Sequence, residues 1–187
     1  MSIALRTYAR SLRTLYLIRF VFAGLWVGVV FATVAQQTAP SALLTSLLVI
    51  YPLFDAAAVL WQLRADPERD RRRTAEWFNV VVSVVIAIAL GIASASSVSA
   101  ALAVWGVWAI VAGVPQLVAA IRNRRSGGQI AQMLSGGISV VAGTGFLLQG
   151  LQGSGMIAGA AGYASLGAVF FLISAIILSV KTREHSA

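Results

Sequence analysis

Long apolar blocks alternate with short polar segments along the whole chain. A helix needs about 20 apolar residues to cross the hydrocarbon core of a bilayer, and each block comes close to that length or exceeds it. Six blocks account for nearly all of the 187 residues, which leaves no room for a soluble domain. The pattern predicts an all-α fold, an integral membrane bundle of six transmembrane helices. The predicted spans are Leu15–Ala35, Ser41–Leu63, Trp77–Ala93, Ala100–Ile121, Ile130–Gln149 and Met156–Val180.

The segments between the blocks differ in charge. Three of them contain no charged residue: loops 36–40, 94–99 and 150–155. The N-terminal segment, loops 64–76 and 122–129 and the C-terminal tail carry every Lys and Arg except Arg19, which lies one turn into the first span. Basic residues stay on the cytoplasmic side during insertion, so we expect both chain termini and all charged loops to be cytoplasmic.

The six spans group into three helical hairpins within a single membrane domain, 1–187. The predicted hairpins are 15–63, 77–121 and 130–180. Their last span residues, Leu63, Ile121 and Val180, are 58 and 59 residues apart, and this regular spacing suggests a duplicated hairpin.

The first 14 residues have a pattern of their own. Ile3, Tyr8 and Leu12 fall near helical spacing and lie opposite the arginines of this segment. The pattern predicts a short amphipathic helix at the membrane surface.

Composition supports the membrane assignment and narrows the chemistry. Charged residues make up only 11% of the chain, against about a quarter in soluble domains. The net charge of +8 does not indicate nucleic-acid binding, because the basic residues cluster at helix ends as membrane topology requires. The absence of cysteine excludes disulfides, thiol catalysis and cysteine metal sites. We find no histidine cluster, no intramembrane carboxylate pair and no phosphate loop, so we expect no enzyme, no metal and no cofactor.

Asp55 is the one acidic residue inside a predicted span. It lies eight residues before Leu63, which places it about 12 Å deep, near the midplane. A carboxylate there costs about 2.5–3.5 kcal/mol on insertion scales, so an intramembrane acid is a candidate functional group. Asp55 is either a proton or cation site, or a protonated or paired residue that holds the first two helices together.

Arg19 is the expected partner of Asp55. It lies about 6 Å above Leu15 along the helix, and the short loop 36–40 makes the first two spans neighbours. The remaining difference in depth is within the reach of an arginine side chain. The alternative is that Arg19 extends toward the lipid headgroups.

Two prolines and one amide complete the candidate polar site. Pro52 and Pro115 each remove a backbone hydrogen bond and are expected to kink their helices. Broken helices mark binding sites in transporters, although kinks also occur in ordinary bundles. Gln116, beside Pro115, is able to donate across the bundle interior or to bond a neighbouring helix.

Other residues suggest contacts with lipid or with protein. The GxxxG pairs Gly24–Gly28 and Gly155–Gly159 predict close helix packing, within the bundle in preference to an oligomer interface. The run Arg71, Arg72 and Arg73 is a candidate contact for anionic lipid headgroups, with a simple topology anchor as the alternative. The expected partners are therefore the lipid bilayer, a second copy of the chain or another membrane protein.

The segment Trp105–Arg122 resembles the outward-to-inward helix of the HdeD-like acid-resistance membrane proteins. Leu134–Gly143 is similar to the helix that follows it in that family. The resemblance implies six spans built from short repeats of paired helices, a bacterial inner-membrane location and a link to acid or general stress. The family offers no catalytic residues to carry over.

Three functions follow from these patterns. The first is a non-enzymatic stress protein that acts by membrane packing, self-association or partner binding. The second is a small proton, ion or solute transporter or channel, with Asp55, Pro52, Pro115 and Gln116 around a cavity. The third is an accessory subunit of a larger membrane complex. The feature that separates them is whether those polar residues converge on one water-accessible space.

Overall fold

The structure is a computed structural model and describes residues 3–66, 73–122 and 129–184. Within these ranges the chain forms six α-helices and no strand, so the fold is the predicted all-α bundle. The helices are α1 (Ile3–Thr33), α2 (Ala42–Ala65), α3 (Thr74–Ser96), α4 (Val98–Arg122), α5 (Gln129–Leu151) and α6 (Ile157–Glu184).

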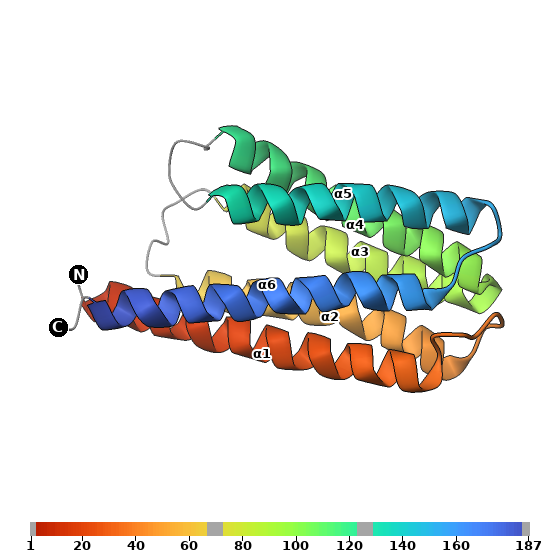
Figure 1. Cartoon of the computed structure of the whole chain (residues 1–187), viewed down its shortest axis with the longest axis horizontal. Helices are drawn as coiled ribbons and strands as arrows, with labels where there is room; N and C mark the ends of the chain where they lie inside the picture. Colours follow the sequence, from red (N-terminus) through yellow and green to blue (C-terminus); the bar gives the residue numbers. More distant parts are fainter. Residues whose placement is uncertain (1–2, 67–72, 123–128, 185–187) are drawn as a thin grey trace.

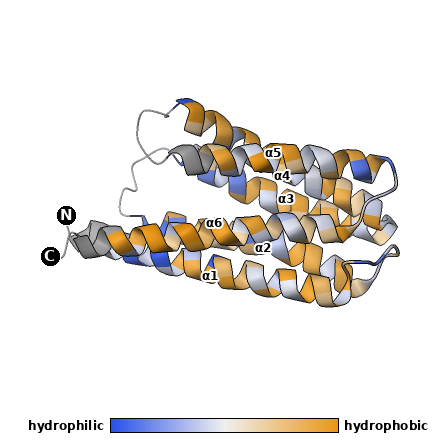
Figure 2. Ribbon diagram, in the orientation of Figure 1, coloured by the Kyte–Doolittle hydropathy of each residue, from blue (hydrophilic) through white to orange (hydrophobic). Residues whose placement is uncertain are grey.

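Each of these helices contains a stretch that is long and apolar enough to cross a membrane. At a rise of about 1.5 Å per residue, the 23 residues of α3 span roughly 35 Å, more than the ~30 Å hydrocarbon core. Apolar residues dominate along the helices, and hydrophilic residues gather near their ends (Figure 2). The chain is a multi-pass membrane protein.

The helices lie side by side in an elongated bundle (Figure 1). α1 begins and α6 ends at the same end of the bundle (Figure 1), which we call the basic end because α2 and α4 also end there, with Arg64 and Arg122 in their last turns. The turns that join α1 to α2, α3 to α4 and α5 to α6 lie at the opposite, uncharged end (Figure 1).

The amphipathic segment 1–14 and the first span are parts of one continuous helix, and not two separate elements. α1 runs from Ile3 to Thr33 without a break. The physical reason is that neither proline nor glycine occurs between Ile3 and Ala23, so nothing interrupts the backbone ladder.

Two of the turns at the uncharged end are shorter than the predicted loops, whereas the turn between α1 and α2 covers residues 34–41 and is longer than the predicted loop 36–40. Ser97 alone separates α3 from α4, in place of the expected loop 94–99. Its backbone N–H donates to the Ala93 carbonyl, and its hydroxyl accepts from the Ala100 N–H, so one residue caps both helices. Gly153, with a φ of 72°, makes the left-handed turn between α5 and α6.

Packing between helices does not follow the predicted hairpins. The most extensive contact joins α4 to α5, followed by α1 with α6 and α2 with α3. α5 touches α6 only slightly, although the short turn near Gly153 connects them. The hairpins 15–63 and 130–180 are therefore connected in sequence without being the closest packed pairs.

Glycines explain the close contact between α4 and α5. A Cβ on Gly106 would lie 2.5 Å from the carbonyl oxygen of Gly143, and a Cβ on Gly113 would lie 2.9 Å from that of Gly136. A Cβ on Gly150 would likewise lie 2.5 Å from a carbonyl oxygen of α4. We call this set the glycine seam. Its glycines recur every seven residues on each helix, so one face of α4 meets one face of α5 at backbone contact.

The two predicted GxxxG pairs have different surroundings. A Cβ on Gly24 or Gly28 would meet no atom within 4 Å among the described residues, so the expectation that this pair packs within the bundle is wrong. Both glycines are on the exposed face of α1. Gly155 and Gly159 do pack within the chain, against Leu102 and Phe146 respectively.

The two halves of the bundle are filled differently. The largest buried cluster lies in the half next to the uncharged end and draws on all six helices, with Trp26, Leu48, Leu90, Trp105 and Phe146 among its members. The half next to the basic end has a smaller buried cluster between α2 and α3 and encloses a cavity.

Candidate functional site

An ion pair between α1 and α2 is the centre of the candidate site. The Nη2 of Arg19 donates to Oδ1 of Asp55 at 2.8 Å, which is the predicted pair. The two side chains are only 11% and 21% exposed. The guanidinium also lies 5.0 Å from the ring centroid of Phe171 on α6, a cation–π geometry. Arg19 therefore points into the bundle and not toward the lipid headgroups.

A serine on α3 completes the surroundings of the carboxylate. The hydroxyl of Ser83 donates to Oδ2 of Asp55 at 3.2 Å, so the two oxygens accept from two different helices. Ser83 itself is fully buried. The sequence did not single out this residue, because a lone serine in a transmembrane helix usually bonds its own backbone.

A cavity of about 520 Å³ adjoins the pair and is lined by residues of all six helices. It reaches toward the basic end, since Ala75 at the start of α3 and Ala119 near the end of α4 line it. Its polar lining residues are Arg19, Asp55, Asn79, Gln116, Ser135, Ser139 and Ser174. Its aromatic lining residues are Tyr16, Phe22, Tyr51, Phe54, Phe78, Trp108, Tyr163, Phe170 and Phe171.

The cavity brings together most of the predicted polar residues. Arg19, Asp55, Pro115 and Gln116 all line it. Pro52 does not line it, since this residue is fully buried elsewhere in α2. One turn before Pro52, the indole N–H of Trp26 donates to the Leu47 carbonyl at 2.7 Å. The sequence grouping therefore holds for four of these residues and fails for Pro52.

An aromatic cluster closes the cavity toward the uncharged end. Tyr51 and Trp108 line the cavity, and both contact Trp105, with ring centroids 5.4 and 5.2 Å away. Trp26 stacks on Trp105 at 5.4 Å and contacts Tyr51 at 4.7 Å. We call these four residues the aromatic floor. They are at most partly exposed, and Trp26, Trp105 and Trp108 are buried, so the floor separates the cavity from the packed half of the bundle.

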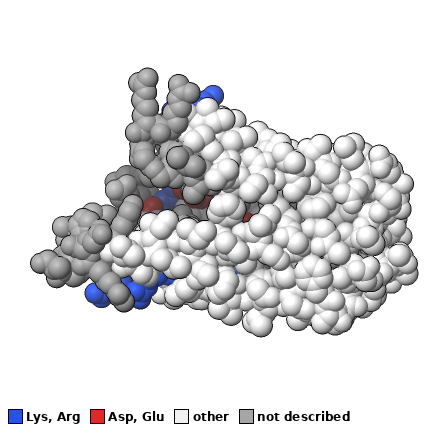
Figure 3. All heavy atoms as spheres, viewed as in Figure 1, with Lys and Arg blue, Asp and Glu red and all other residues white. Residues whose placement is uncertain are grey.

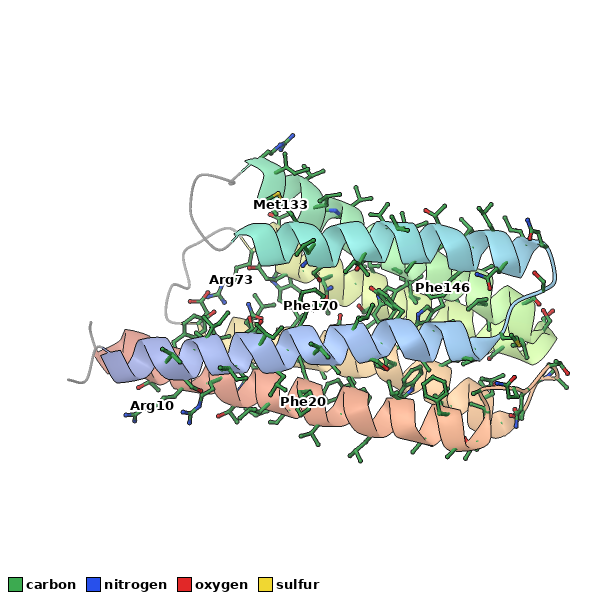
Figure 4. All side chains as sticks on the ribbon, viewed as in Figure 1. Arg10, Phe20, Arg73, Met133, Phe146 and Phe170 are labelled. Atoms are coloured by element: carbon green, nitrogen blue, oxygen red, sulfur yellow. The ribbon has the colours of Figure 1, made fainter. Side chains whose placement is uncertain are left out.

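α5 and α6 meet at one polar contact beside the cavity. The hydroxyls of Ser139 and Tyr163 lie 2.8 Å apart, and Ser139 also donates to the Ser135 carbonyl. The gap between the two helices widens toward the basic end (Figure 1). Phe170 of α6 points into the space between these helices (Figure 4), where it lines the cavity.

The cavity opens on the face between α5 and α6. The space-filling view shows a hollow there, with acidic and basic atoms at its bottom (Figure 3). Since α5 and α6 touch only slightly, no close helix contact seals this side. The cavity lining, which includes the Arg19–Asp55 pair, therefore extends to this flank of the bundle as well as toward the basic end.

Several polar atoms of the cavity wall lack partners among the described residues. They are Nε of Arg19, Oδ1 of Asn79 and Nε1 of Trp108. Trp108 is only 7% exposed and its indole N–H is buried, so this group does not reach bulk solvent either. Buried polar groups without a partner are costly and uncommon, and three of the six such atoms among the described residues belong to the cavity wall.

The predicted lipid contact has a mixed outcome. Arg71 and Arg72 lie outside the described residues. The guanidinium of Arg73 faces the chain itself, donating to the Leu63 carbonyl at 2.6 Å and pairing with Asp66 at 3.4 Å. Arg73 thus caps the end of α2, where free carbonyls attract cations, and its predicted contact with lipid headgroups stays a prediction.

The described residues contain no group of three or more His, Cys, Asp or Glu side chains that would hold a metal ion. In comparison with known proteins, residues 78–148, from α3 into α5, match the model of a family described as a short repeat of unknown function (DUF308). No curated protein and no solved structure matches the chain. The matched region contains the glycine seam and the α4 wall of the cavity.

Proposed function

We propose that this chain is a small membrane carrier that binds a solute in the cavity around Arg19 and Asp55 and exposes it to the two sides of the membrane in turn. The observation that carries the proposal is the convergence of polar side chains from all six helices on one intramembrane space.

Packing alone gives no reason for such a cavity. Protein interiors are close-packed, and a space of about 520 Å³ forfeits contacts that larger apolar side chains would make. A charged side chain near the bilayer centre adds a cost of about 2.5–3.5 kcal/mol on insertion scales. The volume falls within the range of small-molecule sites, about 300–1,000 Å³.

The distribution of packing suggests how access changes sides. The half next to the basic end is hollow, and the half next to the uncharged end is filled behind the aromatic floor. Among the described residues the cavity extends toward the basic end, and we propose that this is its side of access in the state seen here. The slight contact between α5 and α6 leaves the pair α1 and α6 able to move relative to α4 and α5, which the glycine seam holds together.

We assign the site to binding and propose no enzymatic activity. Both oxygens of Asp55 already accept hydrogen bonds, from Arg19 and from Ser83. This arrangement orients a carboxylate and leaves it poorly placed to take a proton from a substrate.

A matched pair of glycine substitutions tests the solute-accessible cavity. Gly167 lines the cavity and Gly162 is exposed on the same helix, and neither would bring a Cβ within 4 Å of another atom. Because the chain contains no cysteine, Ala112→Cys places a single thiol in the cavity wall. A membrane-impermeant, uncharged thiosulfonate that carries a sugar, added at the basic end, should label it, Gly167→Phe should slow labelling about tenfold or more, and Gly162→Phe should not. A thiol that stays unreactive, or reacts equally fast in both variants, would overturn the proposal.

A second candidate function rests on the family match. We propose that the chain is HdeD-like and acts in acid or general stress at a bacterial inner membrane, with both termini cytoplasmic. The support is the match over residues 78–148 together with the resemblance of Trp105–Arg122. Survival of a deletion strain at low pH, with the wild type and Gly167→Phe supplied in trans, separates the alternatives. Rescue by both forms would favour a packing role, and rescue by the wild type alone would favour the carrier.

A further inference from the structure

The charge of the cavity restricts what it accepts. Among the residues that the structure describes, the cavity has one cationic and one anionic side chain, Arg19 and Asp55, which neutralise each other at 2.8 Å. A ligand with a net charge would have to separate this pair or lie in a largely apolar space without a counter-charge, and both are costly. The pair thus favours a ligand with no net charge.

The unused hydrogen-bonding groups are mainly donors. Arg19 has N–H groups beyond the Nη2 that bonds Asp55, and its Nε has no acceptor among the residues described. The indole N–H of Trp108 is in the same situation. Asn79 supplies the one acceptor that lacks a partner in the described cavity wall. These atoms are buried, so a ligand engages them only when the side chains turn toward it; a ligand that complements this set carries acceptor oxygens, as hydroxyl, ether and carbonyl groups do.

The remaining wall is aromatic and open toward lipid. Phe22 stacks on Phe54 at 3.7 Å and Tyr16 on Phe171 at 6.3 Å, so rings from three helices flank the ion pair. Residues of both α5 and α6 line the cavity and these helices touch only slightly, so this flank of the bundle is the side from which lipid would reach it. An apolar chain is able to leave the cavity on this side and remain in hydrocarbon.

From these observations we infer that the cavity takes an uncharged amphiphile from the bilayer. Its oxygen-bearing head lies against Arg19 and Asp55, and its apolar chain extends between α5 and α6. The ion pair selects against charged heads. This inference rests on the proposed function, for which it names the class of substrate.

Tryptophan fluorescence provides a local probe of the site. Trp61 and Trp77 are exposed on the surface, whereas Trp26, Trp105 and Trp108 are buried and belong to the aromatic floor. In a Trp61→Phe/Trp77→Phe background, the fluorescence that remains comes from these three residues. Bromine quenches only at short range, so a probe brominated beside its head group should quench them only from inside the cavity.

The experiment compares three bromodecyl probes with the same chain in liposomes that contain this protein. Their heads are a hydroxyl, a sulfonate and a trimethylammonium group. The alcohol should quench at a membrane concentration about tenfold lower than either charged probe. Gly167→Phe should abolish this quenching and Gly162→Phe should retain it. Equal quenching by all three probes, or none by the alcohol, would overturn the inference.

Charge variants test the selecting role of the pair. Asp55→Asn leaves the Arg19 cation alone and should shift the preference to the sulfonate. Arg19→Gln leaves Asp55 alone and should shift it to the trimethylammonium probe. If a variant failed to fold, the three probes would no longer differ in quenching, and the preference would not change to a charged probe. A preference for the sulfonate in one variant and for the trimethylammonium probe in the other therefore identifies selection by charge. If the wild-type protein is quenched best by a charged probe, the proposed substrate class is wrong and the carrier function still stands. If the alcohol binds but the cavity is accessible from one side of the membrane only, the carrier function is wrong.

Discussion

Removing Asp55 alone should destabilise the protein more than removing Asp55 and Arg19 together. The pair is 11% and 21% exposed and its atoms lie 2.8 Å apart, so the loss of one partner leaves a charge with little water around it. Breaking a buried pair in this way costs about 3–5 kcal/mol, and the adjoining cavity places Asp55→Ala near the lower limit, about 3 kcal/mol. Arg19→Met should cost less, about 1–2 kcal/mol, because a stranded carboxyl is able to take up a proton whereas a guanidinium is not able to lose one.

The double variant Arg19→Met/Asp55→Ala should fall within about 1 kcal/mol of the wild type, because replacing both members of a buried pair is often neutral. The assay is unfolding in mixed micelles of increasing SDS fraction, followed by circular dichroism at matched protein concentration. A coupling energy of about 3 kcal/mol or more between the two positions is expected. Three variants of equal stability, or a double variant equal to the sum of the single ones, would refute the reasoning.

Further predictions concern packing and one hydrogen bond. Gly106→Ala should lower stability by about 1–3 kcal/mol, since its Cβ would lie 2.5 Å from backbone atoms of α5. Gly24→Ala, which meets nothing within 4 Å, should leave it unchanged or raise it by up to about 1 kcal/mol; equal shifts in the SDS midpoint would contradict the glycine seam. Trp26→Phe removes the donor to the Leu47 carbonyl and should cost about 0.5–1.5 kcal/mol. Trp61→Phe, on the exposed surface, is its control and should cost nothing measurable.

The fold was predictable because lipid imposes a simple rule on the sequence. Each apolar block must satisfy its own backbone and therefore forms a helix, and the uncharged loops mark where the chain turns. Helix ends were less predictable, since capping by Ser97 allows α3 and α4 to continue into loop 94–99.

Helix pairing was not predictable from adjacent spans. Helices that are adjacent in sequence, such as α5 and α6, are joined by a turn but do not have to pack along their length. α4 and α5 pack closely because their glycines allow the two backbones to come into contact. The available signal was the seven-residue spacing of Gly136, Gly143 and Gly150, which a search for GxxxG pairs does not detect.

The ion pair was predictable and the cavity was not. The rise per residue gives the depth of Arg19 and of Asp55 in the membrane, and the two depths are similar. A charged side chain inside the membrane has few possible partners, so two opposite charges on neighbouring helices are expected to pair. The cavity depends on the separation between α5 and α6, and no sequence pattern within either helix predicts that separation. Tyr163 and Ser83 join the site through three-dimensional proximity alone.

The sidedness of access to Ala112→Cys tests the carrier most directly. The measurement is the rate of thiosulfonate labelling from each side of sealed vesicles, with Val114→Cys as the control, since Val114 lies outside the cavity lining and is 42% exposed on the same helix. The account predicts fast labelling of Ala112→Cys from the basic end and slower but measurable labelling from the uncharged end, with Val114→Cys unreactive from both sides. Labelling of Ala112→Cys from the basic end alone, at every time and reagent concentration, would contradict alternating access.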